Sequence, residues 1–123
     1  MKTTPTILAL SLLLTACSRH DAEFTKQIPG TWNNTMTIGS NTLTIVPDGS
    51  FSYSRLAANQ QHSWTNTGTW RITEGVVVMT ATNRAGKESW ALGDFLKLRI
   101  IHLDDQLWTY EMDGGATNSM SRQ

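Results

Sequence analysis

The chain has 123 residues, a length typical of one small domain, and its ten basic side chains are balanced by ten acidic ones. This balance argues against nucleic acid as a partner, because nucleic-acid-binding domains carry a basic surface. A single cysteine excludes a disulfide within the chain, so the domain has to be stable without one.

The N-terminal segment has the order of a secretory signal. Lys2 supplies a positive charge, residues 7–14 are mostly apolar, and the small residues Thr15 and Ala16 follow. The apolar run is shorter than the ~20 residues that cross a bilayer as a helix. We therefore predict a signal peptide over residues 1–16.

The cysteine stands directly after this segment. Leu14-Thr15-Ala16-Cys17 resembles the lipobox of bacterial lipoproteins, in which a leucine, two small residues and an obligatory cysteine occur in this order. The resemblance implies that the Cys17 thiol receives a diacylglycerol and that cleavage makes Cys17 the first residue of the mature chain. Two or more acyl chains, each contributing about 0.8 kcal/mol per buried CH₂, give a stable anchor. The partner of this segment is then membrane lipid.

The residue after Cys17 bears on location. In lipoproteins an aspartate at that place often retains the protein at the inner membrane, and this chain has Ser18. The resemblance therefore implies a lipid-anchored protein of the cell envelope, at the outer membrane and facing the periplasm. Residues 17–27 would hold the lipidated cysteine and a short polar tether, and residues 28–123 would form the folded domain.

The folded domain is predicted to be all-β. After the tether, no window sustains the apolar periodicity of a helix, whereas threonine, valine, isoleucine and aromatic residues are frequent. Glycine, asparagine and aspartate interrupt them about every 8–12 residues, which is typical of a sandwich or barrel.

The clearest hairpin lies at residues 42–54. Leu43 and Ile45 alternate with threonines, Pro47-Asp48-Gly49 supplies a turn, and Phe51 and Tyr53 alternate with serines. With a first strand from Gly30, further strands are predicted over residues 63–72, 76–82, 87–91, 96–100 and 106–112. The turns between them are predicted at residues 74–75, 83–86 and 104–105.

This pattern gives about eight strands joined by short connections. Short connections make sequential strands pair antiparallel, so the fold class is an up-and-down antiparallel meander. Eight strands can close into a barrel, which removes exposed edges. A half-open sheet is the alternative.

The tripeptide Gly-Thr-Trp occurs twice, at Gly30-Thr31-Trp32 and at Gly68-Thr69-Trp70. Glycine admits a bend or bulge at strand entry, and a tryptophan two residues later can plug one end of a barrel. We therefore expect Trp32 and Trp70 to be buried near one end of the sheet.

The first copy resembles the Gly-x-Trp signature of lipocalins and their calycin relatives, and the whole resemblance covers roughly residues 28–112. It implies a lipocalin-like β-barrel in which the first tryptophan packs beside an arginine from a late strand, and Arg99 is the candidate by position. The chain lacks a Thr-Asp-Tyr motif and has no helical pattern after the last predicted strand. It is also short for a roomy cup, which argues against transport of a large ligand.

Catalysis is not expected. The three histidines, His20, His62 and His102, show no metal-ligand spacing, and no hydroxyl has a recognisable base beside it. The alternation predicts that His102 continues the inward register of Leu98 as a hydrogen-bonded rim residue, and that Asp104-Asp105 is a turn. The sequence implies no metal and no cofactor.

The leading hypothesis is a binding module for a small apolar ligand. The candidate lining residues are large side chains on predicted strands: Phe51, Tyr53, Trp64, Leu98, Trp108 and Tyr110. An exported inhibitor and a docking module for another envelope protein are the alternatives. A cavity above about 300 Å³ would favour the ligand hypothesis.

Overall fold

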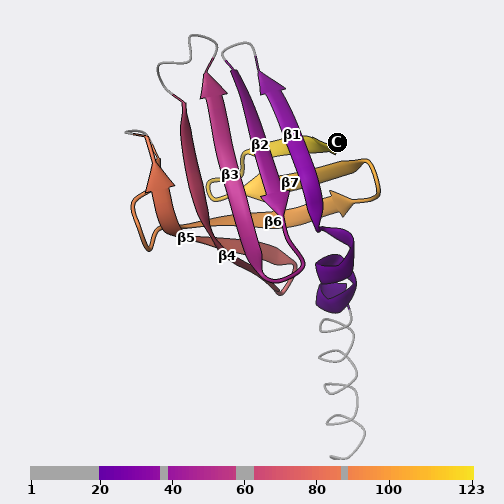
Figure 1. The fold of residues 1–123 in the computed structure, drawn as a ribbon. Helices are drawn as coiled ribbons and strands as arrows, with labels where there is room; N and C mark the ends of the chain where they lie inside the picture. Colours follow the sequence, from indigo (N-terminus) through magenta and orange to yellow (C-terminus); the bar gives the residue numbers. More distant parts are fainter. Residues whose placement is uncertain (1–19, 37–38, 58–62, 87–88) are drawn as a thin grey trace, which may run out of the picture.

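The computed structural model describes residues 20–36, 39–57, 63–86 and 89–123. Within these residues, eight strands form a closed barrel in which each strand pairs antiparallel with the next and β8 pairs with β1 (Figure 1). The strands are β1 (Gly30–Met36), β2 (Gly39–Ile45), β3 (Ser50–Ala57), β4 (Trp64–Thr73), β5 (Val76–Ala85), β6 (Phe95–Leu103), β7 (Leu107–Met112) and β8 (Thr117–Arg122). The predicted all-β meander is confirmed, and it is closed rather than half-open.

Turn chemistry closes the hairpins where the sequence predicted it. Between β4 and β5, Glu74 and Gly75 both have positive φ, at 52° and 75°, which gives a two-residue turn whose twist matches the strands. Between β2 and β3, the Asp48 carboxylate accepts hydrogen bonds from the backbone N–H and the hydroxyl of Ser50. Both turns lie at the end of the barrel that holds the N-terminal helix.

One predicted strand and one predicted turn are wrong. Residues 83–85 continue β5 instead of turning, and the described part of the predicted strand 87–91 is irregular. Residues 87 and 88 lie outside the described residues. The reason is that the backbone of Trp90 forms its hydrogen bonds with the side chain of Asn66 instead of a neighbouring strand.

The eighth strand lies where no strand was predicted. In β8, Met120 is the one buried residue, so the segment lacks the alternation that identifies a half-buried strand. It pairs along its length with β7 and is held to β1 at its end. Tertiary pairing therefore makes this segment a strand.

A short helix lies in the segment that we interpret as a tether. Residues 20–27 are helical, and the Asp21 carboxylate accepts hydrogen bonds of 2.8 Å from the backbone N–H groups of both Glu74 and Gly75. Ile28, directly after the helix, is fully buried in the core. The segment is thus fixed against one end of the barrel. Among the described residues, no helix has the length and apolar character needed to span a bilayer.

Candidate functional site

Two tryptophans fill the end of the barrel that lies next to the N-terminal helix, which we call the closed end. Trp32 and Trp108 are fully buried, with ring centroids 5.8 Å apart in an edge-to-face arrangement. The Trp32 indole N–H donates to the Ile28 carbonyl at 2.9 Å. Trp70 is also buried, and its indole N–H donates to the carbonyl of Val46 at 2.8 Å. The prediction that Trp32 and Trp70 are buried near one end is confirmed.

The arginine that packs on Trp32 is Arg122, not Arg99. The Arg122 guanidinium lies 4.3 Å from the Trp32 ring, and it donates hydrogen bonds to the carbonyls of Gln27, Pro29 and Asp105. Arg99 instead points to solvent and forms a 2.8 Å ion pair with Glu111 on β7. The prediction of Arg99 is wrong because β8, which carries the partner of Trp32, was not recognised as a strand.

An aromatic cluster fills another part of the lumen. The rings of Tyr53, Trp64 and Trp90 contact one another, with centroid distances of 5.5 Å from Tyr53 to Trp64, 5.3 Å from Tyr53 to Trp90 and 6.0 Å between the two indoles. Trp90 also contacts Phe51 at 6.2 Å. Trp90 comes from the β5–β6 connection and folds inward. Its backbone is held by the fully buried Asn66, whose amide accepts from the Trp90 N–H at 2.7 Å and donates to its carbonyl at 3.1 Å.

A cavity of about 200 Å³ lies beside this cluster, and its floor is apolar. Leu96 and Leu98 on β6, Met112 on β7 and Met120 on β8 supply the apolar side chains. Tyr53 and Tyr110 also line it, so three of the six predicted lining residues, Tyr53, Leu98 and Tyr110, lie at one cavity.

The other three predicted lining residues lie elsewhere. Phe51 and Trp108 are core residues, and Trp64 belongs to the aromatic cluster and borders a shallow outer groove. The indole N–H of Trp108 is buried without a hydrogen-bond partner among the described residues. The size of a side chain did not distinguish core residues from cavity-lining residues, because residues of both kinds face inward on the same strands.

Three asparagines that the sequence pattern did not single out also line the cavity, and we call them its rim because they are more exposed than Leu98 and Met120 on its floor. Asn34 on β1 stands opposite Asn41 on β2, and Asn118 on β8 stands opposite Tyr110 on β7. The alternation of β1 and β2 does place Asn34 and Asn41 on the inward face, in register with the buried Trp32 and Leu43. That register is the signal that could have identified them.

The rim lies where β1 and β8 separate. These strands pair at two positions only, Trp32 with Arg122 and Asn33 with Ser121, whereas β1 and β2 pair at seven. Figure 1 shows β1 crossing the yellow β8 at an angle rather than running beside it. Asn34 and Asn118, two of the residues that line the cavity, therefore lie on either side of the unpaired part of this β1–β8 seam.

The two cavity tyrosines are protonated at neutral pH. Burial raises the pKa of Tyr53 to about 12, and the neighbouring Tyr110 adds to this shift while Arg55 opposes it. Burial also raises the pKa of Tyr110, and a hydrogen bond with the Asn34 side chain opposes that shift. Both hydroxyls are thus neutral groups that can donate and accept hydrogen bonds.

Comparison with known proteins identifies the architecture. No family model matches the chain, and no curated protein matches it either. Among solved structures, the crystal structure of a lipocalin-like protein from Bacteroides uniformis ATCC 8492 superimposes with a TM-score of 0.54 at 17% sequence identity. The match covers 79% of this chain and 98% of that one.

The fold is lipocalin-like.

At this level of identity the likeness concerns the fold alone. It agrees with the lipocalin-like barrel that the first Gly-Thr-Trp copy implied. The packing of Arg122 on Trp32 is the contact that the resemblance implied, made by a different residue.

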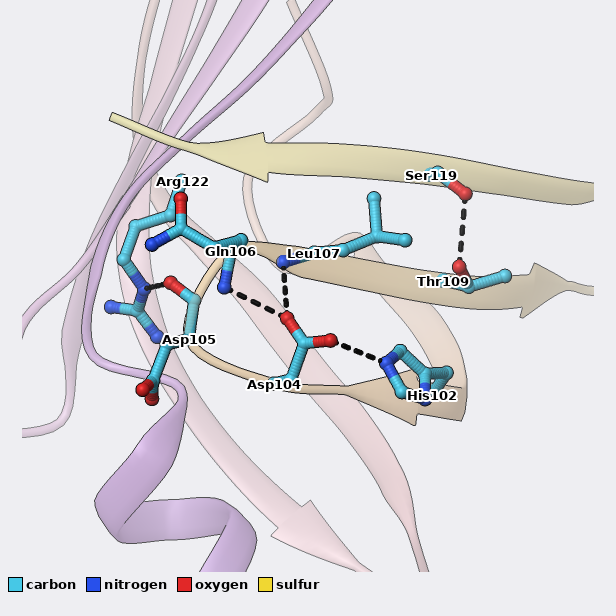
Figure 2. Close-up of polar contacts among 8 residues, drawn as sticks. All are labelled: His102, Asp104, Asp105, Gln106, Leu107, Thr109, Ser119 and Arg122. Carbon is cyan, nitrogen blue, oxygen red and sulfur yellow. Dashed lines mark hydrogen bonds and ion pairs between the residues drawn. The ribbon is translucent and has the colours of Figure 1, made fainter.

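The polar turn between β6 and β7 of this lipocalin-like barrel lies outside the lumen (Figure 2). His102 forms a 2.7 Å contact with Asp104, whose other carboxylate oxygen accepts from the backbone N–H groups of Gln106 and Leu107. The hydrogen bond from His102 and those from the two N–H groups lower the pKa of Asp104 to about 2. Residues 104–105 form a turn, as predicted.

The predicted inward register of His102 is wrong. The β6–β7 pairing shifts between Ile100 and His102, and this bulge turns His102 outward and places the partly buried Leu103 against the core. The His102 side chain is 55% exposed. His62 lies outside the described residues. Within the described part of the chain, no three histidine, cysteine, aspartate or glutamate residues come together as a metal site.

Proposed function

We propose that this protein is a non-catalytic binding module that holds a small ligand in the cavity bounded by Tyr53, Leu98 and Tyr110. The observation that carries the proposal is a cavity of about 200 Å³ with an apolar floor and three asparagines, two of which flank the β1–β8 seam. Binding sites for small molecules typically combine apolar walls with a few placed polar groups. The volume lies below the threshold of about 300 Å³ for a drug-sized ligand, so the proposed ligand is smaller than that.

Native mass spectrometry tests this function. Protein purified from its own host is expected to carry an additional small mass that is released on unfolding. A Met112→Trp variant should lose that mass, because Met112 lines the cavity and the larger side chain would fill it.

The matched control is Asp113→Trp, which places the same side chain at an exposed neighbouring position and should leave the bound mass unchanged. A clean mass for the unmodified chain, together with no response to added small molecules, would contradict ligand binding. A docking module for another envelope protein would then be the better hypothesis, and a pull-down from the envelope fraction would test it.

The proposal places this module at the cell envelope, anchored through lipid on Cys17. What supports this is the likeness of Leu14-Thr15-Ala16-Cys17 to a lipobox; these residues lie outside the described part of the chain. The helix over residues 20–27 begins three residues after Cys17 and is held to the β4–β5 turn by Asp21. An anchor at Cys17 would therefore hold the barrel with this end towards the membrane.

A Cys17→Ser variant is expected to lose all incorporation of labelled palmitate and to accumulate as the unprocessed precursor, because no thiol is left to acylate. Labelling in cells followed by electrophoresis measures both effects. Ser18→Ala is the control and should be labelled and processed normally. Normal cleavage and release of the Cys17→Ser protein would show that the segment is an ordinary signal peptide.

A further inference from the structure

The polar groups around the cavity specify a class of ligand, and this inference rests on the proposed function. The lining includes three primary amides, Asn34, Asn41 and Asn118, and two protonated phenols, Tyr53 and Tyr110. Among the described residues, no charged side chain lines this cavity. Arg55 influences the pKa of Tyr53, but it borders the outer groove with Ser54 and Trp64.

Amides and phenols recognise neutral polar groups. Each asparagine offers a carbonyl acceptor and two N–H donors, and each tyrosine hydroxyl can donate and accept. An ionised carboxylate at this site would lose part of its hydration without gaining an opposite charge, which is unfavourable. A neutral group that both donates and accepts hydrogen bonds would instead satisfy the rim.

The position of the amides sets the orientation of the ligand. Asn34 and Asn118 come from the two strands that separate at the β1–β8 seam, while Leu98 and Met120 lie on the apolar floor and are almost fully buried. A bound molecule would therefore enter with its apolar part first and leave its polar group at the asparagines.

The volume sets the size. An apolar cavity of about 150 Å³ in another protein holds one benzene molecule, so about 200 Å³ accommodates a single ring or a short branched chain with one small polar group. A long acyl chain does not fit within this volume.

We infer that the cavity binds a compact, neutral, amphiphilic molecule whose hydrogen-bonding group is held by Asn34, Asn41 and Asn118, and that it discriminates against carboxylates and long acyl chains. Benzamide, benzoate and toluene form a matched set of probes, because they share one ring and differ in the polar group. Palmitate is added as a long-chain probe.

The experiment titrates each probe into the mature lipid-anchored protein in detergent micelles, and follows the NMR signals of the asparagine side-chain amides and the methionine methyl groups. Benzamide is expected to shift the signals of Asn41, Asn118 and Met120, and to bind at least tenfold more tightly than benzoate or toluene. Asn41→Leu and Asn118→Leu are each expected to weaken the binding of benzamide about tenfold, which is roughly the effect of losing one hydrogen bond. Asn83→Leu, at an exposed position on β5 away from the cavity, should bind benzamide as the unmodified chain does.

The other outcomes are decisive in different ways. Equal or tighter binding of benzoate or toluene, or full benzamide affinity in both rim variants, would overturn the neutral-headgroup inference and leave the binding function intact. Binding of palmitate alone would do the same. If no probe moved any cavity signal, the inference would fail, and a clean native mass would then remove the proposed function as well.

Discussion

A Trp32→Ala variant is expected to lose about 3–5 kcal/mol of unfolding free energy, the usual cost of removing a buried tryptophan. Trp32 is fully buried, packs edge-to-face on Trp108 and carries the guanidinium of Arg122 on its ring. Its loss would also leave the Ile28 carbonyl without its indole donor. Urea unfolding followed by far-UV circular dichroism measures the change as a lower midpoint.

Two further variants make the result specific. Trp70→Ala should fall in the same range, because Trp70 is 8% exposed and holds the Val46 carbonyl. Lys97→Ala, at an exposed position of β6, should stay within about 0.5 kcal/mol of the unmodified chain. A loss below about 1 kcal/mol for Trp32→Ala would contradict its role as the plug of the closed end.

Gly68→Ala is expected to destabilise the barrel by roughly 3 kcal/mol, at the upper end of the cost of overpacking. A Cβ atom at this position would collide with the backbone carbonyl of Thr80 and come within 3.0 Å of the Phe51 ring. The pairing of β4 with β5 shifts between Thr67 and Gly68, so the two backbones approach closely at this bulge. A backbone carbonyl cannot move aside as a flexible side chain can.

Thr69→Ala provides the control, because Thr69 is the exposed neighbour of Gly68 on the same strand. Its unfolding midpoint should stay close to that of the unmodified chain. If Gly68→Ala unfolded at the same midpoint as Thr69→Ala, then the second Gly-Thr-Trp copy would not mark a steric requirement for glycine.

Local sequence pattern predicts the hairpins of this barrel well, because alternation and turn residues act over short distances. The turns at Asp48 and at Gly75 form through the side chain of Asp48 and the positive φ of Gly75, both of which belong to the turns themselves. Each copy of Gly-Thr-Trp also begins with a glycine at which an added Cβ atom would force its neighbours to move. At Gly30 the Cβ would collide with the Arg122 guanidinium, and at Gly68 with the Thr80 carbonyl.

Features that depend on distant contacts were not predicted. The inward fold of Trp90 needs Asn66, which lies 24 residues earlier, and the outward turn of His102 follows a bulge without a local marker. β8 becomes a strand through its pairing with β7 and β1, so the arginine that it carries was assigned to the wrong strand. The polar rim was missed because an asparagine at a cavity and one at the surface look alike in sequence.

The Arg122 contacts also determine when the barrel can close. Arg122 binds the carbonyls of Gln27 and Pro29, partners that precede it by 95 and 93 residues. Contacts of such large sequence separation carry a high loop-closure entropy, and folds that depend on them fold slowly. During synthesis from the N-terminus, the Trp32 ring lacks its cationic cover until Arg122 has been added. A chain halted before that point therefore lacks one of the two β8 residues that pair with β1, and the β1–β8 seam is not yet complete.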